Sequence, residues 1–295
     1  MFVVVVLAAI NLLGIRQAAI VSNVFTIGKL VPIILFVAAG LFFVSPSSYV
    51  LGPAPATGAF SQSVLLLVYA FTGFEMATIP AGEIRNPQKS LPRALLIALL
   101  VVATLYIMIQ VVCVGTLPGL AQSQKPLADA GTQFLGAAGG AIISAGAIIS
   151  ITGNLNILLL TGSRLTFAMS EQKQLPAFVG IIHRQFSTPW VSILITAAIM
   201  MFLTLKSSFV AALTISAIAR LVTYGATCLA LPVFRARREA PAAMFRLRGG
   251  TLLAILSLLL IVWLLVNATR YEVRATAYAA AAGLLIYLAY WLYRR

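Results

Sequence analysis

The sequence predicts an all-α protein that lies in a membrane as a bundle of apolar helices. Of its 295 residues, 61% are hydrophobic and only 9% are charged, whereas a water-soluble domain carries about a quarter charged residues. Such a chain has too little polar surface to cover a globule in water, so the lipid bilayer is its expected solvent. We therefore expect an integral, multi-pass protein of the inner or plasma membrane.

Eight apolar runs are close to, or longer than, the roughly twenty residues that a helix needs to cross a bilayer. They cover residues 18–44, 60–82, 91–117, 134–163, 189–206, 209–234, 251–268 and 273–293. A ninth stretch, residues 2–14, is apolar but too short to span, and is predicted to be a partial helix. The whole chain, residues 1–295, is thus predicted to form a single transmembrane domain.

The basic residues predict how these spans are oriented. Lys and Arg number 20 against 6 Asp and Glu. If the spans alternate from a cytoplasmic Arg16, fourteen basic residues fall on the inner side and four on the outer side. Lys and Arg are enriched in cytoplasmic loops, so the net charge of +14 is explained by topology, and no nucleic-acid partner is expected.

Residue patterns typical of enzymes and channels are missing from the sequence. It contains no nucleophile elbow, metal-binding histidine pair or phosphate loop, and His183 is the only histidine. Cys113 and Cys228 both lie in apolar runs, where cysteine behaves as a small hydrophobic residue. Rings of like charge, which line many channels, are also missing. We therefore expect no catalytic residue, no metal site and no cofactor.

Polar residues interrupt the middle of the run 60–82. Gly73 lies beside Thr72 and two residues before Glu75. Glycine weakens a helix by about 1 kcal/mol, and a carboxylate deep in a membrane costs about 2.5–3.5 kcal/mol. One interpretation is a helix break whose freed N–H and C=O groups bind an amino acid. The other is a glycine that permits close helix packing, with Glu75 in a structural pair; we favour the break.

Lys29 lies about 16 Å from the start of its helix, at about 1.5 Å per residue. Ser22 and Thr26 share its helical face, since the spacings are four and three residues. An ammonium group at that depth needs a partner or must lose its charge. The alternative is a lysine that extends its ammonium group to the membrane surface, but the depth makes that difficult.

Arg220 is the second cation inside an apolar run. Ser216, Thr223 and Thr227 lie on its helical face, with Tyr224 next to Thr223. Arg220 is predicted either to form a structural ion pair, for example with Glu75, or to contact the substrate, and the sequence leaves both open.

Several stretches resemble the amino acid–polyamine–organocation (APC) superfamily. Residues 11–16 (NLLGIR) and 23–30 (NVFTIGKL) resemble the junction between its fourth and fifth spans. Residues 69–75 (YAFTGFE) and 83–93 (EIRNPQKSLPR) resemble its sixth span and the following loop, and the latter is the most specific match. The resemblance extends from the fifth to the twelfth span of the superfamily.

This resemblance implies a leucine-transporter-like helical bundle that lacks the first three and a half spans. In that fold the broken first and sixth spans hold the substrate at the midplane. The substrate-binding residues implied here are Tyr69, Ala70, Phe71, Thr72, Gly73 and Glu75. The resemblance also implies that Lys29, together with Thr26, takes the place of a bound sodium ion and couples substrate occupancy to protonation or helix position. Because half of the superfamily's substrate site lies on the missing spans, the given chain is expected not to transport by itself, and its reading frame is expected to extend upstream.

The function expected from these features is secondary active transport of an amino acid, by proton-coupled symport or by exchange, in a truncated permease. The alternatives are a transporter of polyamines or other organocations, and a non-transporting membrane scaffold or accessory subunit. The sequence leaves open the identity of the amino acid, the coupling mode and the oligomeric state.

The expected orientation is testable by cysteine labelling. Cysteines introduced beside Lys89 and Arg237 should be shielded from a membrane-impermeant thiol reagent in intact cells, because basic loops stay in the cytoplasm. Cysteines beside Gly52 and Gln124 should be labelled. All four sites should react in permeabilised cells, which serve as the control. The reverse pattern in intact cells would contradict the orientation.

Overall fold

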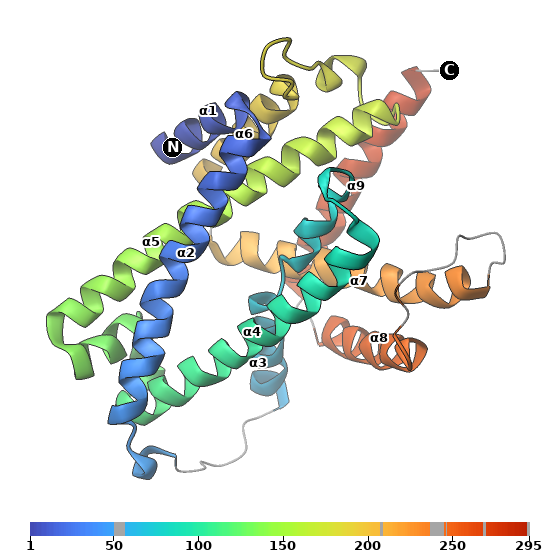
Figure 1. The fold of residues 1–295 in the computed structure, drawn as a ribbon. Helices are drawn as coiled ribbons and strands as arrows, with labels where there is room; N and C mark the ends of the chain where they lie inside the picture. Colours follow the sequence, from blue (N-terminus) through green and yellow to red (C-terminus); the bar gives the residue numbers. More distant parts are fainter. Residues whose placement is uncertain (50–56, 207–208, 237–244, 246, 268–269, 294–295) are drawn as a thin grey trace. The chain divides into compact units, whose positions relative to one another are not determined.

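The computed structural model describes residues 1–49, 57–206, 209–236, 245, 247–267 and 270–293. Within these residues the chain forms nine α-helices and several short 3-10 helices, and no strand (Figure 1). The α-helices are α1 (Phe2–Leu13), α2 (Ile15–Gly40), α3 (Thr57–Ala70), α4 (Pro87–Thr116), α5 (Pro126–Glu171), α6 (Trp190–Lys206), α7 (Phe209–Ala236), α8 (Gly250–Val266) and α9 (Arg270–Tyr293). The predicted all-α fold class is confirmed.

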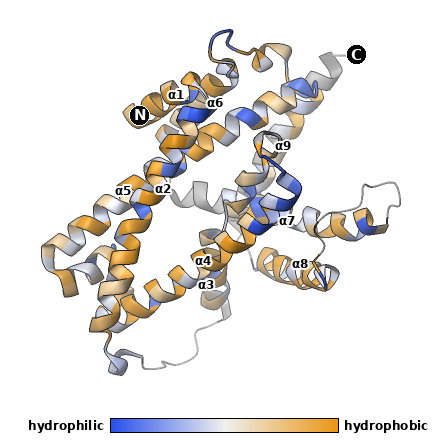
Figure 2. Cartoon of the chain, in the orientation of Figure 1, coloured by the Kyte–Doolittle hydropathy of each residue, from blue (hydrophilic) through white to orange (hydrophobic). Residues whose placement is uncertain are grey.

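Five segments in the described part of the chain are long and apolar enough to cross a membrane. These are Arg16–Phe43, Gly58–Thr78, Pro87–Thr116, Pro126–Glu171 and Ser216–Ala236. Hydrophobic residues cover most of their length (Figure 2), and many of their large apolar side chains are exposed. A helix overlaps each of the eight expected runs, while the number that cross the membrane stays a prediction. Gly52 and Arg237, which mark the expected orientation, lie outside the described residues.

The chain divides into two compact units. Unit 1 comprises Met1–Pro53, Leu95–Glu171 and Ala177–Met201, and unit 2 comprises Ala54–Ala94, Gln172–Pro176 and Phe202–Arg295. Whether the chain works as a single transmembrane domain stays a prediction.

Unit 1 is organised around the packing of α2 against α5, and the two helices cross in Figure 1. Two glycines of α5 make this close approach possible. A methyl group at Gly146 would lie 2.9 Å from the ring of Pro32, and one at Gly153 would lie 2.8 Å from the Cβ of Phe25. Small residues at helix interfaces allow such close contact in membranes, where van der Waals packing drives helix association.

A buried amide cluster joins α1 and α2 to α5. Gly14 separates α1 from α2 with φ 135° and ψ 164°, a backbone conformation that favours glycine. Asn156 of α5, which is fully buried, accepts a hydrogen bond from Asn11 Nδ2 at 2.9 Å. Its own Nδ2 donates to the carbonyl of Ala18 at 3.1 Å and to Ser22 Oγ at 2.9 Å. One side chain therefore fastens both sides of the Gly14 joint.

Unit 2 contains α3, α7, α8 and α9. Leu221 of α7 packs with Ile261 and Leu264 of α8 in a buried apolar cluster. Val64, Leu65 and Val68 of α3 pack against the same cluster. This core holds α3 and the polypeptide that follows it against α7, which is the arrangement on which the candidate site is built.

Candidate functional site

The helix predicted over residues 60–82 is broken close to its middle. α3 ends at Ala70, and the chain resumes as a short 3-10 helix, η3 (Phe74–Thr78). Between them Gly73 has φ 107°, a left-handed conformation that strains any residue with a Cβ. The backbone N–H and the hydroxyl of Thr72 both donate to the carbonyl of Tyr69, at 3.0 and 2.7 Å. The predicted break is therefore present, and Gly73 and Thr72 are its local causes.

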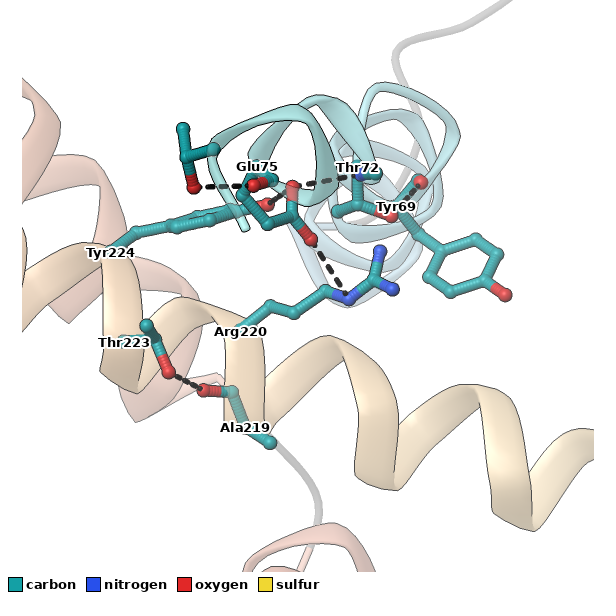
Figure 3. Close-up of polar contacts among 9 residues, drawn as sticks. Tyr69, Thr72, Glu75, Ala219, Arg220, Thr223 and Tyr224 are labelled. Carbon is teal, nitrogen blue, oxygen red and sulfur yellow. Dashed lines mark hydrogen bonds and ion pairs between the residues drawn. The ribbon is translucent and has the colours of Figure 1, made fainter. Parts of the chain in front are cut away.

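The carboxylate of Glu75 folds back over this break (Figure 3). Its Oε2 accepts a hydrogen bond from the backbone N–H of Gly73 at 2.9 Å and another from the hydroxyl of Tyr224 at 2.8 Å. Its Oε1 lies 3.4 Å from Nε of Arg220. Glu75 thus fixes the conformation of the break and links it to α7.

Arg220 and Tyr224 reach Glu75 from successive turns of α7, because residues four apart share one helical face. The Glu75 and Arg220 side chains are 27% and 22% exposed, so their ion pair is largely removed from solvent. Phe74 stacks on Tyr224 with ring centres 5.7 Å apart, which covers one side of the cluster. Of the two alternatives for Arg220, the ion pair with Glu75 is present, and contact with a substrate stays a prediction.

The remaining predicted substrate residues lie at the end of α3 and in the turn that follows. Tyr69 and Phe71 are half-buried, and Ala70 is exposed. The backbone N–H of Phe71 still donates to Leu67 and Val68 carbonyls, at 3.3 and 3.1 Å, so the helix tightens before it breaks. Tyr224 was the partner that sequence reasoning missed, although its four-residue spacing from Arg220 was visible.

Lys29 and Thr26 lie in unit 1, on α2. Lys29 is half-buried, and Thr26 is exposed, with its hydroxyl donating to the carbonyl of Ser22 at 2.8 Å. Ser22 belongs to the amide cluster around Asn156. Because Lys29 and the break at Gly73 belong to different units, their roles as parts of one mechanism stay a prediction.

The described residues contain no group of three or more His, Cys, Asp or Glu side chains arranged to hold a metal ion. The chemistry available at the break is a carboxylate, a guanidinium, a phenol and a distorted backbone, all within an apolar segment of membrane-spanning length. These groups suit binding of a small polar solute.

The fold and this polar break define a multi-pass integral membrane protein with an interrupted helix. The chain belongs to the amino acid permease family, whose model matches residues 1–290. It is 32% identical over 211 residues to the serine/threonine exchanger SteT of Bacillus subtilis, which covers 70% of this chain and 48% of that protein.

Two further relatives from the same organism align over most of the chain. The methylthioribose transporter is 28% identical over 303 residues, covering 98% of this chain and 63% of that protein. The branched-chain amino acid permease BcaP is 26% identical over 291 residues, which cover 94% of this chain and 60% of that protein. The chain therefore spans from about half to less than two thirds of the length of these relatives.

The bond between Tyr224 and Glu75 is testable by a double-mutant cycle on thermal unfolding in lipid nanodiscs. Tyr224→Phe, Glu75→Gln and the double variant should give a coupling free energy of roughly 1.5–3 kcal/mol, as expected for a hydrogen bond to a charged group. Tyr278→Phe removes an exposed hydroxyl from α9 and should show no coupling with Glu75→Gln. A coupling energy of zero at Tyr224 would exclude the bond.

Proposed function

We propose that this chain carries the substrate site of a secondary transporter of amino acids, working by exchange or by proton-coupled symport. The observation that carries the proposal is the break at Gly73, with Glu75, Arg220 and Tyr224 gathered on it. Ionisable residues inside a membrane are costly, and they mark substrate or ion pathways far more often than they serve packing.

The proposed substrate residues are those that surround the break: Tyr69, Ala70, Phe71, Thr72, Gly73 and Glu75. Non-helical backbone at membrane depth is tolerated where it lines a cavity or is buried in protein. Discontinuous helices of this kind hold substrates in other transporters. Tyr69 and Phe71 add aromatic surface on either side of Ala70, which suits contact with the apolar part of an amino acid.

The names of the relatives support amino acids without a charged side chain as substrates. One relative exchanges serine and threonine, and another is a permease for branched-chain amino acids. A third transports methylthioribose, so the substrate of this chain has to be measured rather than transferred by name.

Lys29 is proposed as the coupling residue, with Thr26 on the same face of α2. The support is a half-buried cation in the middle of a membrane-length helix. A fixed ammonium in this position provides the charge that a bound sodium ion would otherwise supply, so the protein would need no sodium gradient.

The substrate site is tested by counterflow in proteoliposomes, with a complete version of the protein as the parent. Vesicles preloaded with unlabelled serine or leucine should accumulate the labelled amino acid, and Gly73→Leu should abolish this uptake. A leucine at φ 107° strains the backbone, and its side chain fills the space beside the break.

Gly283→Leu is the matched control, because nothing lies within 4 Å of a methyl group at Gly283. Its uptake should match that of the parent protein. Equal uptake by Gly73→Leu and the parent would show that the substrate site lies elsewhere. The proposal would be refuted if the parent showed neither amino-acid binding nor counterflow.

The coupling role is tested separately by Lys29→Ala in a complete version of the protein. Without the ammonium group, uptake against a gradient and its dependence on pH should be lost, while the protein still inserts and still binds amino acid. Lys29→Arg keeps the positive charge and should retain part of the concentrative uptake. A Lys29→Ala variant with parental accumulation and an unaltered pH profile would refute the coupling role.

A further inference from the structure

The Glu75 carboxylate is already occupied by donors from its own unit. Oε2 accepts from the Gly73 N–H at 2.9 Å and from the Tyr224 hydroxyl at 2.8 Å. Oε1 faces the Nε of Arg220 at 3.4 Å, and this guanidinium offsets the negative charge. These contacts use three of the roughly four lone-pair sites of the carboxylate. Glu75 therefore stabilises the break, and its charge is balanced within the protein by Arg220.

Arg220 differs from Glu75 because most of the N–H donors of its guanidinium make no hydrogen bond within the described residues. The group carries five N–H donors in a planar fork, and its contact with Glu75 is through Nε. Within the described residues, its two terminal nitrogens have no acceptor at hydrogen-bonding distance. In Figure 3 one of them is turned toward the broken helix and the other away from Glu75. The edge of this ion pair that is open to a ligand is therefore the guanidinium edge, with its N–H donors.

We infer that Arg220 is a specificity-determining residue of the proposed amino-acid site, admitting substrates of zero or negative net charge and excluding those with a cationic side chain. The inference rests on the proposed function and names its substrate class. A lysine-like side chain at this edge meets guanidinium N–H groups that never lose their proton, and the Glu75 carboxylate that could offset its charge is already paired with Arg220. Repulsion between like charges is strong at this depth, because little water is present to screen it.

Glu75 and Arg220 can also be assigned the opposite roles. If Glu75 were the partner of a substrate ammonium, cationic amino acids and polyamines would be favoured, and Arg220 would serve only to hold the acid. The three donors on Glu75 and the free edge of Arg220 argue against that assignment.

The test compares norleucine with lysine, which has the same backbone and a similar side chain but carries an additional amine. Binding of each is measured to the purified chain in lipid nanodiscs by competition against labelled leucine. The parent protein should bind lysine at least about tenfold more weakly than norleucine, equivalent to roughly 1.4 kcal/mol. In Arg220→Gln the ratio of the lysine Kd to the norleucine Kd should fall towards one or below it, because Glu75 loses its guanidinium partner. Arg220→Lys keeps the charge and should still discriminate.

Two further variants keep the test decisive. Thr223→Val is the matched control on α7: its hydroxyl donates to the carbonyl of Ala219 at 2.9 Å, away from Glu75, and its ratio should equal that of the parent. The Glu75→Gln variant should still bind lysine more weakly than norleucine, because Arg220 remains. The break then lacks the carboxylate that stabilises it. If the parent protein prefers lysine and Glu75→Gln loses that preference, the opposite assignment is supported. This comparison decides between the two assignments even if Arg220→Gln does not fold.

The outcomes separate this inference from the proposed function. Binding of norleucine with an Arg220→Gln ratio equal to the parent's, or equal binding of lysine and norleucine by the parent, overturns the role of Arg220 and leaves amino-acid binding standing. No binding of any amino acid by the parent refutes the proposed function and the inference with it.

Discussion

A carboxylate inside an apolar, membrane-length segment is the constraint on which the second unit depends. An ionised group in the hydrocarbon region is tolerated when charge and hydrogen bonds from the protein replace water. Glu75 obtains these from the backbone of Gly73, the phenol of Tyr224 and the guanidinium of Arg220. The interrupted helix and α7 are therefore held together by the same group, and the apolar cluster of Leu221, Ile261 and Leu264 keeps them in position.

The first unit solves a different problem, the packing of two long helices at short distance. Gly146 and Gly153 remove side chains where Pro32 and Phe25 press against α5. A small buried polar cluster is centred on Asn156, whose directional hydrogen bonds add to the apolar packing. Lys29 lies on the same helix as Ser22, a member of that cluster, so any movement of α2 carries both.

The sequence was most informative where local chemistry decides the structure. Gly73 beside Thr72 in an apolar run predicted the break, because a left-handed turn and a side chain that competes for backbone carbonyls are local effects. The partner of Arg220 was left as one of two alternatives. Helical spacing shows which residues share a face of α7, but it does not show which distant segment that face meets. Asn156 escaped notice because an amide in an apolar run has no diagnostic spacing, and its partners lie more than 130 positions away.

The amide of Asn156 also governs how the first two helices can move. It is bonded to Asn11 before Gly14, and to Ala18 and Ser22 after it. Glycine allows the backbone to turn at position 14, but the hydrogen bonds of Asn156 reach across this joint and restrain it. A change in the angle between α1 and α2 stretches at least one of these bonds in a setting without water to replace it. While these hydrogen bonds are intact, α1 and α2 are both held to α5 and the angle at Gly14 is fixed.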